Sequence, residues 1–112
     1  MATATFVQDG KSIDYTPVAA VAAGDVVVLG NIVGVAKLDI AASKLGALAI
    51  EGVFDVAKAT GSSSAITAGS KVYWDAVSEV ATTTAGSNKC MGYAIKDAGD
   101  DDATVRVKLE RA

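Results

Sequence analysis

Carboxylates are the side chains in this sequence whose type and spacing best suit chemistry. Glu51 and Asp55 lie four positions apart in an apolar run typical of a β-strand, which predicts both on one face. Two carboxylates on one face can serve as general acid and general base. Between neighbours such as Val53 and Phe54, the same spacing is also typical of the polar face of an amphipathic strand, and we favour that interpretation.

The other candidate reactive groups also favour structural roles over chemical ones. The range 97–102 contains four aspartates, whose oxygens suit calcium, but the spacing differs from that of an EF-hand loop and we expect no metal site. Cys90 is the single cysteine, which excludes an internal disulfide and suits synthesis in a reducing cytosol. No base or cluster of cations lies near it in sequence, which favours a buried, unreactive thiol.

The sequence contains no histidine, which excludes Ser-His and Cys-His nucleophile pairs and every metal site that uses histidine. Gly69-Ser70-Lys71 has part of a phosphate-binding loop, but its lysine leads into a predicted strand rather than a helix. The stretch from Gly30 to Gly34 lacks the third glycine and the following helix of a dinucleotide-binding fingerprint. We therefore expect no catalytic residue, no cofactor and no enzymatic activity.

Composition narrows the class of protein further. The 112 residues suit a single domain, and 51% hydrophobic with 21% charged residues is typical of a folded chain. There are 22 alanines and 15 valines but only six aromatic residues, so the core buries little area per side chain and support from an oligomer is expected. The net charge of −3 and the scattered lysines argue against nucleic-acid binding.

Neither a signal peptide nor a membrane span is expected. Residues 1–12 lack a basic start and an apolar h-region. The most apolar stretch, from Val18 to Val35, is interrupted by glycine, aspartate and asparagine, whereas a membrane helix needs ~20 continuous apolar residues.

Short Val-rich runs separated by Gly, Ser, Thr and Asp predict an all-β fold. The clearest strand is 103–110, in which apolar and polar residues alternate. The other predicted strands are Thr3–Gln8, Ser12–Tyr15, Asp25–Leu29, Ile32–Lys37, Ala47–Lys58, Lys71–Asp75, Glu79–Thr83 and Cys90–Lys96. Asp9-Gly10 and Gly30-Asn31 predict hairpin turns, and Ala41–Leu45 predicts at most one helical turn. A compact barrel-like domain and a two-sheet sandwich both fit this pattern.

The sequence also contains an internal echo. Ala23-Gly24-Asp25-Val26-Val27 is similar to Ala68-Gly69-Ser70-Lys71-Val72, and Val33-Gly34-Val35-Ala36-Lys37 is similar to Met91-Gly92-Tyr93-Ala94-Ile95-Lys96. Each pair predicts a Gly-led turn into a strand, followed by a strand whose glycine permits a bulge or a close backbone approach. The spacing differs between the copies, but two β-halves of similar design fit the pattern.

Taken in order, these pieces resemble a family of phage head decoration (cement) proteins, small capsid-stabilising proteins of tailed phages and prophages. The resemblance runs from about Thr5 to Leu109 and departs at Ser70, where an acidic residue is expected. It is carried by the two echoed motifs together with Glu51-Gly52-Val53-Phe54-Asp55-Val56-Ala57-Lys58, Tyr73-Trp74-Asp75 and Thr104-Val105-Arg106-Val107-Lys108-Leu109. A recombinase-like label given to some members has no support here, because the nucleotide-binding loop is missing.

The resemblance implies a structural virion protein that binds the outer surface of the expanded phage head. It would stabilise contacts between subunits of the major capsid protein, self-associate as a homotrimer and be made in the host bacterial cytoplasm. Trimers would gain strength from multivalent contact. Partners beyond the capsid protein and the chain itself, such as nucleic acid or membrane, are not expected.

The candidate contact residues lie in two places. The N-terminal residues 1–9 are a predicted extended arm, whose capsid-contacting residues are Ala2, Thr3, Ala4, Thr5 and Phe6. The same segment also fits as the first strand of the domain's own sheet. Tyr73 and Trp74 are candidates for the contact between subunits, because adjacent strand residues face opposite ways and one ring should point outward. An outward ring covered by a neighbouring loop fits equally well.

Other functional classes fit less of the sequence. A tail or head-fibre base module predicts a longer chain with repeats or a receptor-binding loop. A non-catalytic glycan-binding domain predicts several exposed aromatic residues on one face. An enzyme requires a buried carboxylate pair or an activated Cys90.

Overall fold

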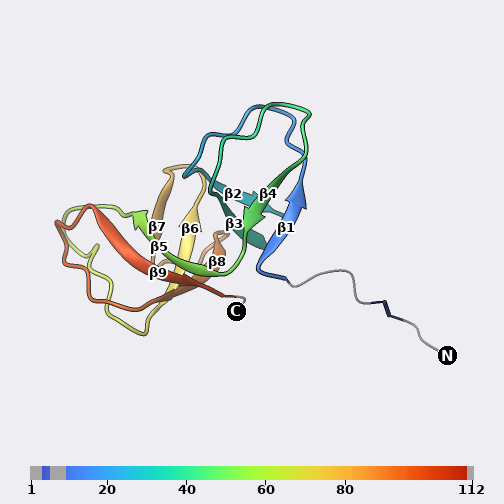
Figure 1. Ribbon diagram of the computed structural model, residues 1–112. Coiled ribbons are helices and arrows are strands. Elements are labelled where there is room, and N and C mark those ends of the chain that lie inside the picture. Colours follow the sequence, from blue (N-terminus) through green and yellow to red (C-terminus); the bar gives the residue numbers. More distant parts are fainter. Residues whose placement is uncertain (1–3, 6–9, 111–112) are drawn as a thin grey trace.

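Two antiparallel sheets form the molecule (Figure 1). The computed structural model describes residues 4–5 and 10–110, and within this part of the chain there are nine strands and no helix. The first sheet contains β1 (Ser12–Tyr15), β2 (Val26–Leu29), β3 (Ile32–Ala36) and β4 (Gly46–Ala49), in the order β1-β4-β3-β2. The second contains β5 (Gly52–Ala57), β6 (Lys71–Asp75), β7 (Val80–Thr82), β8 (Lys89–Ala94) and β9 (Thr104–Leu109), in the order β5-β9-β8-β6-β7.

The predicted all-β class is confirmed, and the sandwich is the architecture found. An isolated parallel bridge between Lys58 and Ala81 brings the edge strands β5 and β7 of the second sheet together without a continuous ladder. Neither sheet is closed into a barrel. The described part of the chain has no helix long and apolar enough to cross a membrane.

The two sheets are built to the same plan, with β7 as an addition to the second. Strands β1 to β4 correspond in order to β5, β6, β8 and β9. The backbone hydrogen bonds repeat as well: Gly24 donates to the Ala36 carbonyl at 2.6 Å, and Gly69 donates to that of Ala94 at 2.7 Å. The bridge from Val21 to Ile40 likewise recurs between Ile66 and Ala98. The internal echo in the sequence is therefore a structural duplication.

The prediction of one strand over Ala47–Lys58 is wrong. The chain leaves the first sheet after β4 and enters the second at β5, so the apolar run contains two strands in different sheets. Gly52, at a φ of 121°, adopts the conformation that this turn requires and that other residues rarely take. Glu51 lies between the strands and Asp55 lies within β5, so the two carboxylates do not share one strand face.

Two of the predicted turns are found at the expected residues. The hairpin at Gly30-Asn31 is confirmed, because Leu29 pairs with Ile32 and Gly30 has a φ of 60°. The prediction of at most one helical turn at Ala41–Leu45 holds, and the turn found there is a β-turn: Lys44 donates to the Ala41 carbonyl at 3.1 Å, and Ser43 has a φ of 63°. The predicted strand Thr3–Gln8 and its Asp9-Gly10 turn lie largely outside the described residues.

Two clusters of buried side chains form the hydrophobic core. The smaller one belongs to the first sheet and is centred on Ala36, Ile40 and Leu48. In the larger one, Val33 and Val35 of β3 join buried residues of the second half of the chain. These residues lie in the second sheet, except for the bridged pair Ile66 and Ala98; they are Val56, Ile66, Val72, Trp74, Ala81, Met91, Ala94, Ala98, Val105, Val107 and Leu109. Most of the side chains are small, so close packing of the strands supplies much of the burial.

Candidate interaction surfaces

The predicted arm lies mostly outside the described residues. Ala2, Thr3 and Phe6 belong to that undescribed part, whereas Ala4 and Thr5 are described and exposed. The arm precedes β1, which is an edge strand of the first sheet. An edge strand offers backbone groups for pairing with a further strand.

Tyr73 and Trp74 point to opposite faces of β6, as predicted. Trp74 is 7% exposed and packs in the larger core, while Tyr73 is half-buried on the other face. The sheet register places Tyr73 between Thr82 of β7 and Cys90 of β8. Trp74 therefore contributes mainly to the core, although part of it also lines a groove described next.

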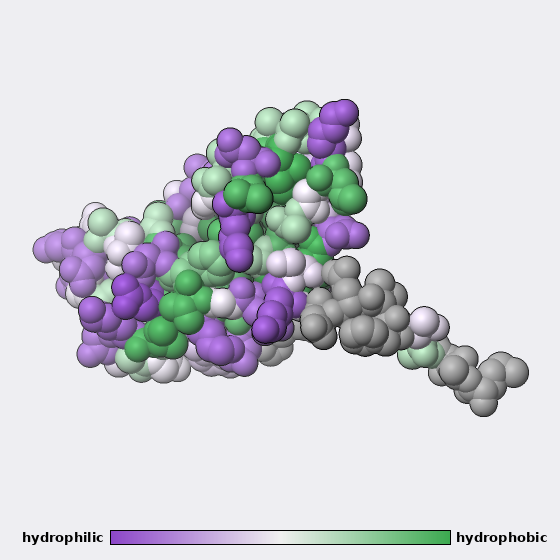
Figure 2. All heavy atoms as spheres, in the orientation of Figure 1, coloured by the Kyte–Doolittle hydropathy of each residue, from purple (hydrophilic) through white to green (hydrophobic). Residues whose placement is uncertain are grey.

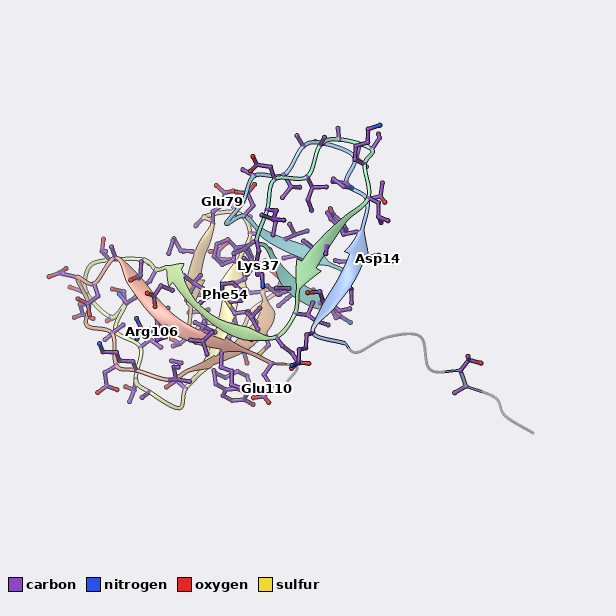
Figure 3. All side chains as sticks on the ribbon, viewed as in Figure 1. Asp14, Lys37, Phe54, Glu79, Arg106 and Glu110 are labelled. Atoms are coloured by element: carbon purple, nitrogen blue, oxygen red, sulfur yellow. The ribbon has the colours of Figure 1, made fainter. Side chains whose placement is uncertain are left out.

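A groove of about 690 Å³ lies between the edge strands β2 and β5. Most of its lining residues are apolar, and three carboxylates lie among them: Asp25, Asp55 and Glu79. The apolar lining comes from Val21, Val26, Val27, Val28, Val35, Phe54, Val56, Ala57, Trp74 and Ala76. Figure 3 shows Phe54 on β5 and Glu79 in the turn between β6 and β7. An apolar groove between two strand edges is suited to a protein segment as occupant.

One carboxylate of the groove is held by a cation. Asp55 pairs directly with Arg106 across β5 and β9, with Oδ1 to Nε at 2.9 Å and Oδ2 to Nη2 at 3.3 Å. The hydrogen bond and the charge of Arg106 hold the pKa of Asp55 below its usual value. Both side chains are about half exposed, so this ion pair adds little stability but fixes the direction of the carboxylate.

The acidic range 97–102 holds loops together. Asp100 Oδ1 accepts the N–H groups of Ser64 and Ala65 at 3.1 and 2.9 Å, and Asp102 Oδ2 accepts that of Gly99 at 2.7 Å. Within residues 4–5 and 10–110, no group of three or more acidic or cysteine side chains is arranged to hold a metal ion. Such aspartates act as caps of turns, a use that sequence clustering alone does not reveal.

Lys58 is a buried, hydrogen-bonded lysine that the sequence analysis did not single out. Its side chain is 4% exposed, and Nζ donates to the carbonyls of Ala59, Asp100 and Asp102 at 2.7, 3.2 and 3.2 Å. Ser64 Oγ lies 3.5 Å from the same atom. The available signal in the sequence was a lysine at the end of a strand, next to a loop rich in hydroxyl groups.

Cys90 lies on β8 and is half-buried. Its Sγ contacts the carbonyl oxygen of Gly92 at 3.9 Å. An acceptor at this distance forms a weak hydrogen bond with a thiol and does not act as an activating base.

These observations define an all-β protein whose candidate sites are surfaces and strand edges. Residues 7–109 match the family described as phage cement protein. The chain therefore belongs to the phage cement protein family, a class of phage structural proteins associated with the capsid, and the suspected resemblance is confirmed. Searches of curated proteins and of solved structures gave no match.

Proposed function

We propose that the protein binds the outer surface of the expanded phage head and stabilises contacts between subunits of the major capsid protein. The observation that carries this proposal is the family match over residues 7–109. The protein would be made in the host bacterial cytoplasm and act without catalysis, as a homotrimer. Each trimer would contact several capsid subunits at once, and multivalent contact strengthens binding well beyond one interface.

The fold supports this role through its exposed strand edges. In the proposal, residues Ala2–Phe6 form the capsid contact by pairing with a sheet edge of the capsid protein, with Phe6 as the apolar anchor. Backbone pairing would supply affinity, while the alternation of Ala2, Ala4 and Phe6 with threonines would supply register. Tyr73 and Trp74 are assigned to contacts between copies, since Trp74 lines the groove between β2 and β5.

Purified protein mixed with expanded, undecorated heads of its own phage tests the proposal. We expect saturable binding by pelleting, extra density on the outer surface by electron microscopy, and greater resistance of the heads to heat. Deletion of residues 1–8 should abolish binding, whereas Ala4→Ser, a polar change at a small exposed side chain, should weaken it only slightly. Absence of binding to intact expanded heads would overturn the proposal.

A further inference from the structure

The loop end of the first sheet exposes an unusual amount of apolar surface. We define this apolar tip as residues 17–20 and 37–45, two loops joined by a hydrogen bond from Ser43 N to the Pro17 carbonyl at 2.8 Å. Val18, Leu38 and Leu45 are 96%, 78% and 70% exposed. The exposed alanines 19, 20, 41 and 42 add to the same surface. Contiguous exposed apolar residues mark interaction sites in folded proteins.

The duplication supplies an internal control for this surface. The β-turn from Ala41 to Lys44 recurs from Gly99 to Asp102, with the same 3.1 Å hydrogen bond. In the second sheet, however, the turn contains three consecutive aspartates, and Lys96 occupies the position of Leu38. Figure 2 shows green and pale green spheres beside purple ones at the end of the first sheet, and mostly purple and pale spheres at the end of the second. The backbone therefore does not require apolar side chains at the tip, so they serve another purpose.

The same chain carries a surface that complements the tip. Lys37 and Lys44 flank the apolar residues of the tip, and the carboxylate of Asp39 is directed to the Ala23 N–H group at 2.8 Å. Most residues that line the groove between β2 and β5 are apolar, and three carboxylates lie among them, of which Asp55 is paired with Arg106. In a contact between these two surfaces, apolar side chains would meet apolar side chains, and lysines would meet carboxylates.

We infer that the protein self-associates by placing the apolar tip of one copy in the β2–β5 groove of the next. The contact joins two different surfaces, so every copy can donate one tip and receive another. Such contacts are head-to-tail and can close into a ring. They would also cover the edges of β2 and β5, which otherwise invite uncontrolled strand pairing. This inference rests on the self-association part of the proposed function and does not depend on head binding.

Sedimentation of the purified full chain over a range of concentrations tests the contact. Leu38→Ser with Leu45→Ser should weaken association about tenfold or more, because apolar side chains leave the interface. Ile95→Ser is the matched control: Ile95 is 48% exposed but lies outside both surfaces, and its change should leave association as in the wild type. Circular dichroism should show that each variant is folded.

Mixing two defective variants gives a sharper test. Val28→Lys places a cation in the apolar wall of the groove, and this copy retains an intact tip. The double serine variant retains an intact groove. At a concentration where the wild type associates, each variant alone should be mostly monomeric, and an equal mixture should form pairs, because one intact tip meets one intact groove.

Any one of three results would overturn the inference. The first is a wild type that remains monomeric at every concentration. The second is a tip variant that associates as strongly as the wild type, and the third is a mixture that stays monomeric. Dissociation after deletion of residues 1–8, with the tip variants unaffected, would instead place the N-terminal segment in the groove. Since these measurements use the protein alone, a failure to bind heads would leave their result unchanged.

Discussion

Asp39 and Asp97 make the same hydrogen bond in the two halves of the molecule. Asp39 Oδ1 accepts the N–H group of Ala23, and Asp97 Oδ1 accepts that of Ala68, both at 2.8 Å. Each aspartate thereby ties the loop after β3 or β8 to the glycine-containing turn before β2 or β6. The duplicated backbone is held by a duplicated side-chain bond, although the sequences around the two aspartates differ.

Replacing either aspartate by alanine should lower the free energy of unfolding by about 1–2 kcal/mol, because a charge-assisted hydrogen bond to a loop is lost. Urea denaturation of Asp39→Ala and Asp97→Ala measures the two effects. Asp101→Ala is the control at an exposed aspartate in a turn and should change stability by less than ~0.5 kcal/mol. A loss confined to one half would contradict the equivalence of the two bonds.

Lys58→Met should destabilise the protein by about 2–4 kcal/mol, since three part-buried carbonyl groups lose their donor. The straight apolar side chain keeps most of the packing, so the change isolates the polar contribution. Hydrogen exchange should show faster exchange at Gly61 and Ser64, whose N–H groups donate to Asp100. Lys96→Met, at an exposed lysine, should have little effect, and equal stability of both variants would refute the role of Lys58.

Acid should release the bond between Asp55 and Arg106. The pKa of Asp55 is lower in the folded chain than its ordinary value of 3.8, so this pair stabilises the fold above that pH. The contribution is lost as the pH falls through the lowered, folded pKa. Carboxyl chemical shifts across a pH titration should show Asp55 titrating below its usual range, and Arg106→Gln should return it toward that range. An unchanged titration in Arg106→Gln would contradict this assignment.

Gly92→Ala should destabilise the protein by about 3 kcal/mol or more. A Cβ atom there would overlap the backbone carbonyl of Lys108 in β9, and the paired strands cannot separate without losing their ladder. Gly34 is its counterpart in the first sheet, where a Cβ would lie 3.0 Å from the Leu48 side chain. Gly34→Ala should therefore cost less, and Gly10→Ala, which has open space, should cost little. Thermal or urea unfolding ranks the three variants, and a milder effect at Gly92 than at Gly34 would disagree with the geometry.

Local patterns predicted much of this fold, because strands and tight turns are determined largely by residues that are close together in the sequence. The alternation at Val105, Val107 and Leu109 and the Gly30-Asn31 turn depend only on near neighbours. The sequence pattern did not reveal that the run 47–58 is divided into two strands. Apolar residues occur on both sides of Gly52, because the strand before it packs in one sheet and the strand after it packs in the other. Sequence could not separate one long strand from two short strands without knowing what each one covers.

The candidate surfaces were harder to predict, because they depend on residues far apart in the chain. The groove joins Val28 of β2 to Glu79 beyond β6, and Lys58 reaches a turn more than forty positions away. Carboxylate spacing along the chain suggested Glu51 with Asp55, whereas the fold pairs Asp55 with Arg106. Such partners are set by strand order, which local spacing does not encode.

The contacts of Lys58 also bear on how one loop end responds to the ions around it. Clusters of backbone carbonyls and turn aspartates in other proteins often close around calcium, and they open when the ion is removed. Here the positive charge is covalently attached to the end of β5 and reaches the carbonyls from inside. It is neither diluted away nor extracted by a chelator. The cation at this corner belongs to the chain itself, and we expect the shape of the corner to be the same in a salt-poor medium as in a salt-rich one.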